Sequence, residues 1–304
     1  MTSFTIRVPS SSANLGAGFD SLALGLALYN TLEVEIGGEE LMVEIEGEGE
    51  NSLPRNATNR VVRAALTRST QRGDSLPGLK LRMVNHIPVG GGLGSSAAAA
   101  VAGMILAEAI GETEFSRDAL LMPVFEMEGH ADNAAASLYG GLVLVHATKG
   151  HVVARSIAIP DFWVALALPL LDLPTREMRR SLPKTVSLGD AASNVSSALL
   201  TVEALRQGDY ELLGSVPEDR LHQPHRKGFI PGFDRVASAA KEAGAAAVVL
   251  SGAGPGLLAF APGGHAAIAA AMVDAFQDEG LAARPFVLGV DRLGATLSRN
   301  PNAV

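Results

Sequence analysis

Residues 88–98 of the chain are PVGGGLGSSAA, in which four glycines and two serines precede an alanine-rich run that extends to residue 110. Serine at the start of such a run is a common N-cap, so the pattern predicts a helix over residues 95–110. Glycine permits positive φ and lets a ligand approach the backbone closely. Successive free N–H groups and the positive end of the helix dipole together favour an anion. The sequence therefore predicts a phosphate-binding segment at residues 90–96, here called the glycine loop.

The glycine loop differs from a Walker A loop, because no G-x-x-x-x-G-K-[ST] pattern occurs in the chain. A plain glycine turn before an N-capped helix is the alternative interpretation. The number of glycines, the adjacent Ser95 and Ser96, and the strong helix pattern that follows favour phosphate binding. Either serine hydroxyl is also available to a metal ion that accompanies the phosphate.

Apolar residues in alternation predict strands on both sides of the glycine loop, and apolar residues at helical spacing predict helices. The predicted strands cover residues 4–8, 32–36, 43–45, 79–83, 141–146, 151–159 and 163–170, and a strand, a glycine turn and a second strand cover residues 245–261. The other predicted helices cover residues 117–128, 194–206, 233–243 and 266–276. Because strands and helices do not alternate regularly, the pattern favours an α+β fold over repeated βαβ units.

Length and composition indicate two folded domains. The chain has 304 residues, of which 47% are hydrophobic and 18% are charged, so it contains enough apolar material for sizeable cores. We place the domain boundary near residue 155. One predicted domain covers residues 1–155 and the other covers residues 156–304.

Charge and cysteine content exclude several classes of function. The 24 Lys and Arg residues and 32 Asp and Glu residues give a net charge of −8, which is unfavourable for binding nucleic acid. The chain has no cysteine, which excludes disulfides, thiolate zinc sites and cysteine nucleophiles. Its longest stretch without charged residues, 243–273, is interrupted by glycine and proline and predicts no membrane span. Because the N-terminus predicts a strand and no signal peptide, we expect a cytoplasmic protein.

Four segments carry a resemblance to a known family. In chain order they are residues 9–20 (PSSSANLGAGFD), the glycine loop, residues 128–133 (EGHADN) and residues 251–255 (SGAGP). Together they resemble the GHMP kinase superfamily, and SANLGAGFD and EGHADN are similar to segments of its homoserine kinases. The chain departs from the family pattern at Ala17 and Ala131, where proline is usual, and at Gly256, where threonine is frequent. These departures remove no functional group.

The resemblance implies a fold and a reaction. The fold is the two-domain GHMP kinase fold, with an N-terminal domain like domain 2 of ribosomal protein S5, a ferredoxin-like C-terminal domain and an active site in the cleft between them. The reaction is the Mg-ATP-dependent phosphorylation of the side-chain hydroxyl of L-homoserine to O-phospho-L-homoserine, in threonine biosynthesis. ATP and Mg²⁺ are the implied cofactors, and a homodimer is the expected assembly. No nucleic-acid or membrane partner is expected.

The resemblance also implies residues that bind the nucleotide and the metal. The phosphate site consists of Pro88, Gly90, Gly91, Gly92, Leu93, Gly94, Ser95 and Ser96. Asn59 matches an asparagine that recognises adenine, and a helix N-cap is an equally good interpretation of this residue. Ser96 and one glutamate are the expected magnesium ligands, because Mg²⁺ prefers hard oxygen ligands and retains several waters. Glu126 and Glu128 both qualify, and they lie about 200° apart around a helix, so they cannot both face the metal.

Homoserine is a zwitterion with a hydroxyl group, so its site needs cations for the carboxylate and acceptors for the ammonium group. Arginine suits the carboxylate because its planar fork binds both oxygens. The substrate residues implied by the family are Asn14, Asp20, His130, Thr175, Arg179 and Arg226. Arg180, next to Arg179, is expected to be structural or exposed.

Asp132 and Asp20 are the catalytic candidates. Asp132 occupies the position at which mevalonate kinases carry an aspartate taken as the catalytic base. A dissociative phosphoryl transfer needs little base assistance, so we assign Asp132 to positioning and electrostatics, with general base as the alternative role. Capping of the helix that follows is a further interpretation of Asp132.

Three other functions are alternatives to homoserine phosphorylation. Another small-molecule kinase of the same superfamily would lack the paired arginines that a zwitterion requires. A non-catalytic metabolite sensor would lack the carboxylates or the serine pair, all of which are present in this chain. An unrelated phosphate-binding domain would leave the other three segments unexplained.

Overall fold

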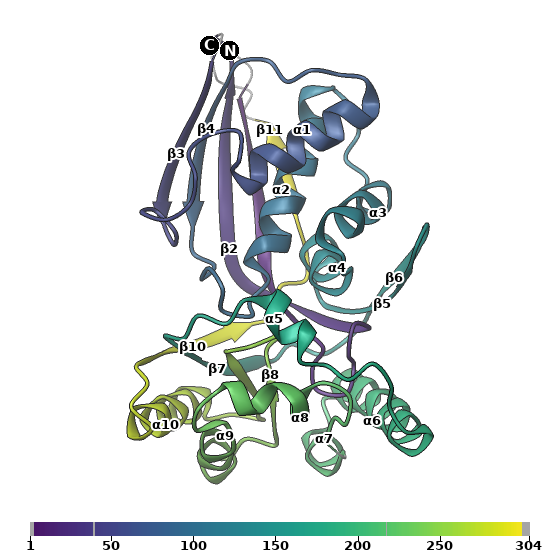
Figure 1. Cartoon of the computed structure of the whole chain (residues 1–304), viewed down its shortest axis with the longest axis vertical. Helices are drawn as coiled ribbons and strands as arrows, with labels where there is room; N and C mark the ends of the chain where they lie inside the picture. The colour runs from purple at the N-terminus through teal and green to yellow at the C-terminus, as the bar shows by residue number, and fades with distance from the viewer. Residues whose placement is uncertain (1–2, 39, 217, 300–304) are drawn as a thin grey trace.

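The computed structural model describes residues 3–38, 40–216 and 218–299, which form two sheets with helices packed on each (Figure 1). The larger sheet has seven strands, in the order β11-β1-β2-β4-β3, with β5 pairing to β2 and β6. These strands are β1 (Ser3–Ala13), β2 (Leu22–Ile36), β3 (Leu41–Gly47), β4 (Leu79–Asn85), β5 (Leu142–Thr148), β6 (His151–Ile157) and β11 (Thr296–Arg299). Only β3 and β4 are paired in parallel.

Four helices cover one face of the larger sheet. They are α1 (Arg60–Arg72), α2 (Ser95–Ile110), α3 (Arg117–Glu128) and α4 (Asp132–Tyr139). Helices α2 and α4 pack on the sheet, and α1 and α3 pack on α2. Helix α2 is thus buried on nearly all sides, and its small residues permit close packing. At Gly103 of α2, a Cβ would lie 2.1 Å from the carbonyl oxygen of Val61, so the α1–α2 contact requires glycine there.

The smaller sheet has four antiparallel strands in the order β10-β7-β9-β8. They are β7 (Trp163–Pro169), β8 (Ala247–Leu250), β9 (Leu257–Phe260) and β10 (Ala283–Gly289). Helices α9 (Phe233–Glu242) and α10 (His265–Asp278) pack on this sheet. The remaining elements are α5 (Thr175–Arg180), α6 (Leu188–Gln207), α7 (Tyr210–Ser215), α8 (Gln223–Arg226) and the 3₁₀ turn η1 (Lys227–Phe229).

One hydrophobic cluster spans both sheets, and a second lies between the smaller sheet and the helices α9 and α10. Leu258 and Phe260 of β9 belong to the same buried cluster as Leu24 and Leu26 of β2. The end of the described chain returns to the larger sheet, because β11 pairs with β1. The predicted boundary between residues 155 and 156 falls inside β6, and residues 1–2 and 300–304 of the two predicted domains lie outside the described ranges. The division into these two domains stays a prediction.

The α+β fold predicted from the sequence is confirmed, and every predicted strand and helix overlaps an observed element. The apolar patterns do not predict α1, α4, α5, α7, α8, β10 or β11, although the capping interpretations of Asn59 and Asp132 imply helices at the positions of α1 and α4. Within the described ranges, no helix combines the length and the apolar character needed to cross a membrane.

Candidate active site

The glycine loop connects β4 to α2 and presents the helix N-terminus to a cavity. The N-cap of α2 is Gly94, at φ 71°, and Ser95 is the first helical residue, so the predicted serine cap is wrong. Only glycine adopts this positive φ readily, and Gly94 has no side chain with which to cap the helix. The first-turn N–H groups of α2 therefore stay available to an anion, with the positive end of the helix dipole behind them.

Two glycines of the loop are required by their neighbours. A Cβ at Gly92 would lie 2.2 Å from the carbonyl oxygen of Ser251, and a Cβ at Gly94 would lie 2.1 Å from Oγ of Ser11. The Ser251 hydroxyl donates a hydrogen bond to the carbonyl oxygen of Gly92 (2.8 Å). The segment at residues 251–255 thus packs against the glycine loop. By contrast, no described atom lies within 4 Å of a Cβ placed at Gly90.

On one side of the glycine loop lies a mainly apolar cavity of about 260 Å³. Its walls include Leu53, Asn59, Val61, Met83, Val89 and Ser95. Asn59 is the N-cap of α1, where its Oδ1 accepts the N–H of Val61 (2.9 Å) and its Nδ2 donates to the carbonyl oxygen of Pro54 (2.8 Å). The capping interpretation of Asn59 is confirmed, and its role in adenine recognition stays a prediction.

On the other side lies a polar cleft of about 780 Å³, lined by the glycine loop, by residues 128–130 and by α5. Arg60, Gly90, Ser95 and Ser96 line both the cleft and the apolar cavity, so the two spaces adjoin along the loop. A ligand with an apolar ring and a phosphate chain matches this pair of spaces. Pro88 and Leu93 are buried beneath the loop, and their role as nucleotide ligands stays a prediction.

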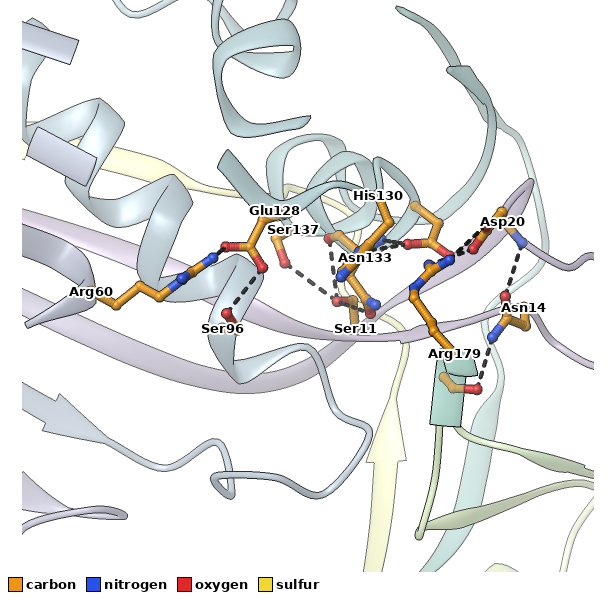
Figure 2. A network of polar contacts seen from close by, with 12 residues as sticks. Ser11, Asn14, Asp20, Arg60, Ser96, Glu128, His130, Asn133, Ser137 and Arg179 are labelled. Carbon is orange, nitrogen blue, oxygen red and sulfur yellow. Dashed lines mark hydrogen bonds and ion pairs between the residues drawn. The ribbon is translucent and has the colours of Figure 1, made fainter. Parts of the chain in front are cut away.

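Glu128, at the end of α3, faces the glycine loop, whereas Glu126 is exposed. The carboxylate of Glu128 accepts a hydrogen bond from the Ser96 hydroxyl (3.0 Å) and forms an ion pair with Arg60, whose Nε lies 2.9 Å from Oε1 (Figure 2). The structure therefore favours Glu128 over Glu126 as the metal ligand, a choice that the sequence left open. Arg60 was not predicted, although it directly follows Asn59 in the sequence.

His130 lines the cleft just before α4 (Figure 2), and Asp132 is the first residue of that helix. The side chain of Asp132 is 3% exposed, and its Oδ1 lies 3.4 Å from Nδ1 of His130. Nδ1 of His130 is buried and forms no hydrogen bond with the described residues, and the Asp132 carboxylate is the charged group that faces it. The N-cap of α4 is Ala131, and Asp132 instead accepts the N–H of Asn133 (2.7 Å). The N-cap interpretation of Asp132 is therefore wrong.

The segment at residues 9–20 comprises the end of β1 and the loop that follows it, in which the backbone is strained. Asn14 and Asp20 have positive φ values of 70° and 51°. The Asn14 amide holds this conformation, because its Oδ1 accepts the N–H of Asp20 (3.0 Å) and its Nδ2 donates to the carbonyl oxygen of Gly252 (2.8 Å). The Asp20 carboxylate is directed to α5, where both its oxygens bind the guanidinium of Arg179 (Figure 2).

Arg179 and Arg226 approach the same region from α5 and α8. Burial works against the charge of Arg179, but its hydrogen bonds to Asp20 and the nearby charge of Asp132 raise its pKa. Arg226 is 1% exposed, and its Nη1 donates to Nδ1 of His222 (3.1 Å) and to the carbonyl oxygen of Gly252 (3.3 Å). Burial and the nearby positive charge of Arg179 lower the pKa of Arg226 to about 10, so it stays charged at neutral pH.

The structure brings most of the predicted site residues to this cleft. Thr175 and Arg179 line it directly, and Arg180 is exposed at its edge, as expected. Four other predicted residues do not line the cleft but lie next to residues that do. Asn14 and Arg226 bind the carbonyl oxygen of Gly252, Asp20 binds Arg179, and Asp132 lies beside His130. His222, which contacts Arg226, was not among the predicted site residues, although its spacing of four from Arg226 was a usable signal.

A metal site made only of protein side chains does not fit the described residues. Among them, no cluster of three or more His, Cys, Asp or Glu side chains occurs. The Ser96 hydroxyl and the Glu128 carboxylate, 3.0 Å apart, instead supply two hard oxygen ligands beside the phosphate loop. This donor set fits Mg²⁺, which retains waters and takes further oxygens from substrate phosphates.

Two family models match the chain. The model of the GHMP kinases N terminal domain matches residues 59–141, and that of the GHMP kinases C terminal matches residues 201–278. A curated relative from Moorella thermoacetica named homoserine kinase is 40% identical over 277 residues, which cover 91% of this chain and 93% of the relative. A homoserine kinase from Synechocystis is 36% identical over 304 residues, covering 98% and 99%.

Solved structures show the same architecture. The crystal structure of homoserine kinase from Cytophaga hutchinsonii has a TM-score of 0.85 and 28% identity, and the match covers 97% of both chains. The mevalonate kinase of L. major in complex with R-mevalonate has a TM-score of 0.69, with 16% identity and coverage of 96% and 95%. The second likeness is one of fold alone.

Proposed function

The chain belongs to the homoserine kinases of the GHMP kinase family, and we propose on that premise how its cleft phosphorylates the hydroxyl of L-homoserine. The protein is an ATP-dependent kinase with the two-domain fold of this family. The product is O-phospho-L-homoserine, as threonine biosynthesis requires. One observation carries the residue assignment: Arg179 lines the cleft together with the glycine loop, binds the Asp20 carboxylate, and lies near the buried guanidinium of Arg226.

The nucleotide occupies the two adjoining spaces along the glycine loop. The apolar cavity beside Asn59 takes the adenine ring, and the backbone N–H groups of residues 90–96 bind the phosphates. Arg60 adds a positive charge where the two spaces meet. The loop thereby compensates phosphate charge without the lysine of a Walker A motif.

Ser96 and Glu128 are the proposed protein ligands of Mg²⁺. When bound, Mg²⁺ neutralises charge on the phosphate oxygens as the γ-phosphoryl group is transferred. Glu128 is paired with Arg60 in this structure, so the carboxylate is already held beside the loop. Glu126 is exposed and is not part of this proposal.

The zwitterion of homoserine matches the charges at the other side of the cleft. Its carboxylate binds the guanidinium groups of Arg179 and Arg226, and its ammonium group binds the Asp20 carboxylate. Asn14 keeps Asp20 in its positive-φ conformation through the bond from the Asp20 N–H. Thr175, at the start of α5, supplies a hydroxyl at the same wall.

Asp132 and His130 hold the reacting hydroxyl group toward the phosphate chain. The unpartnered Nδ1 of His130 and the nearby Asp132 carboxylate supply the polar groups for this hydroxyl. Asp132 acts by position and charge, because bond formation to the nucleophile lags behind departure of the leaving group in a dissociative transfer. Asp20 assists by fixing the ammonium end of the same substrate.

Turnover with a panel of acceptors tests the proposal. ADP release is measured with Mg-ATP and L-homoserine, D-homoserine, L-serine, mevalonate, galactose or no acceptor. Rapid turnover with L-homoserine alone is the expected result. Turnover with another alcohol only would retain the phosphate and metal sites but contradict the roles of Asn14, Asp20, Arg179 and Arg226. Tight ATP binding without turnover would favour a metabolite sensor.

The proposal also includes a homodimer and a cytoplasmic location. The family resemblance supports the dimer, and a chain without cysteine fits a reducing compartment such as the cytoplasm. Sedimentation equilibrium of the purified chain tests the dimer, for which a mass near twice 31.4 kDa is expected.

A further inference from the structure

His222 is a fully buried histidine that connects three segments of the substrate site. Its side chain is 0% exposed and lies directly before α8. The ring contacts the carbonyl oxygen of Gly16 and the guanidinium of Arg226, and it stacks on Phe19 at a centroid distance of 5.3 Å and an interplanar angle of 26°. Two of these partners belong to the loop at residues 9–20, and the third is a proposed substrate residue.

The hydrogen bonds of His222 determine its protonation state. Nε2 lies 2.8 Å from the carbonyl oxygen of Gly16, which can only accept, so Nε2 carries the proton. Nδ1 lies 3.1 Å from Nη1 of Arg226, which can only donate, so Nδ1 carries none. The ring is therefore neutral, with its proton on Nε2. Burial lowers the pKa of His222, in agreement with this assignment.

The charges that face His222 come from three elements. Asp219 lies before α8, and its Oδ2 is 3.6 Å from Nε2 of His222. Asp20, in the loop between β1 and β2, and Arg226, in α8, contribute the other two charges. The Asp219 carboxylate binds the backbone at the start of α8, where its Oδ2 accepts hydrogen bonds from the N–H groups of His222 (2.9 Å) and Gln223 (2.6 Å). Asp219 thus holds the histidine backbone at the start of α8.

Arg226 has one terminal nitrogen left for a ligand. Its Nη1 binds His222 and the carbonyl oxygen of Gly252, and its Nε lies 3.4 Å from the carbonyl oxygen of Met178. Among the described residues, none accepts a hydrogen bond from Nη2. The partners of Nη1 and Nε therefore fix the plane of the guanidinium and leave Nη2 for a carboxylate.

We propose that neutral His222 is a positioning residue, which fixes the guanidinium of Arg226 through Nδ1 and couples it to the loop at residues 9–20 through Nε2. The inference rests on the proposed function, because the carboxylate that Arg226 binds is that of homoserine. A proton on Nδ1 would remove the acceptor and direct an N–H toward the guanidinium. The substrate site therefore requires the uncharged form of His222.

Two substitutions of His222 separate positioning from packing. His222→Phe retains a flat ring against Phe19 but lacks both nitrogens. His222→Asn loses the stacking and retains a carbonyl acceptor near the position of Nδ1. His225 is exposed in the same helix, so His225→Phe and His225→Asn are matched controls. Steady-state kinetics and thermal unfolding are measured on the full chain.

We expect His222→Phe to raise the KM for homoserine on the order of 10-fold or more, as for loss of a hydrogen bond to a charged group. The KM for ATP stays within about twofold, because the His222 ring bonds to Gly16 and Arg226 and not to the glycine loop itself. His222→Asn recovers much of the homoserine KM even where its Tm is lower, and the His225 variants match the wild type. An unchanged homoserine KM in a folded His222→Phe protein overturns the inference.

Histidine ¹⁵N NMR of the wild-type protein gives a second test that needs no variant. The expected spectrum at pH 7 shows His222 neutral, with its proton on Nε2. A charged ring, or a proton on Nδ1, overturns the inference even if the His222 variants do not fold. Failure of the proposed function is distinguishable, because the wild-type protein would then not turn over L-homoserine in the acceptor panel.

Discussion

Arg179 binds both carboxylate oxygens of Asp20, with distances of 3.0 Å from Nη1 to Oδ2 and 2.7 Å from Nη2 to Oδ1. The two residues are 159 positions apart in the sequence and belong to α5 and to the loop before β2. Each is the proposed partner of one charged end of homoserine. Binding would therefore exchange one ion pair of the protein for two ion pairs with the zwitterion, which leaves no charge unpaired.

Arg179→Ala tests this exchange. We expect the KM for homoserine to rise about 10- to 150-fold, which corresponds to the loss of about 1.5–3 kcal/mol for hydrogen bonds to a charged group. Arg179→Lys recovers only part of the loss, because an ammonium group cannot bind both oxygens as a fork. The KM for ATP is expected to change little, and initial-rate kinetics measures both constants.

Arg180→Ala is the comparison for Arg179→Ala, since Arg180 is the exposed neighbour in α5. We expect nearly wild-type kinetics. Equal effects of the two substitutions would mean that the local positive charge, and not the geometry of Arg179, binds the substrate.

Arg226→Ala is expected to raise the KM for homoserine while ATP binding stays nearly intact. Removal of one partner of a buried charged hydrogen bond costs about 2–5 kcal/mol, which corresponds to an increase of at least about 30-fold in KM. Calorimetric titration with ATP and kinetics with homoserine measure the two effects separately. A loss of ATP affinity with an unchanged homoserine KM would assign Arg226 to the nucleotide instead.

Glu128→Gln and Glu126→Gln form a matched pair on α3. We expect Glu128→Gln to reduce kcat/KM by more than about 100-fold and to raise the Mg²⁺ concentration needed for half-maximal rate, because even partners of metal ligands contribute about 10- to 100-fold. Glu126→Gln should behave as wild type, since Glu126 is exposed. Rates over a magnesium titration measure the difference, and the opposite ranking of the two variants would reject Glu128 as the ligand.

Gly92→Ala and Gly90→Ala compare a tightly packed position of the glycine loop with an open one. Both glycines have positive φ, 75° and 78°, so each alanine costs about 1–2 kcal/mol of strain. Only the Cβ at position 92 would meet the carbonyl oxygen of Ser251, at 2.2 Å. We therefore expect a lower Tm for Gly92→Ala than for Gly90→Ala in thermal unfolding monitored by circular dichroism. Similar Tm values would contradict the close contact with Ser251.

Elements with strong periodicity were predictable, whereas the edge strands β10 and β11 were not. The alternation over residues 79–83 and the apolar run over 163–170 correspond to β4 and β7, which are interior strands of their sheets. In contrast, β10 contains Arg284 and Pro285, and it was not predicted. It is an edge strand, where one side of the backbone needs no partner and proline is tolerated.

The apolar spacing of residues 60–72 did not predict helix α1, because much of the surface of this helix is polar. Its residues are RVVRAALTRSTQR, and its stability depends on the apolar positions that pack on α2, such as Val62 and Ala65. The N-cap of α2 was predicted one residue too late for a related reason. Serine is a common N-cap, so the sequence favoured Ser95, but the close contact with Ser11 requires glycine at position 94.

Local sequence determined the chemistry of the phosphate site and the family, because the glycine loop, its helix and the other three segments are each contiguous in the chain. Only the tertiary structure selected Glu128 over Glu126, added Arg60 and His222, and paired Asp20 with Arg179. The physical reason is distance along the chain. Arg60 and Glu128 are 68 positions apart and meet because α1 and α3 both pack on α2, whereas Asp20 and Arg179 are 159 apart and meet where α5 lies against the loop before β2.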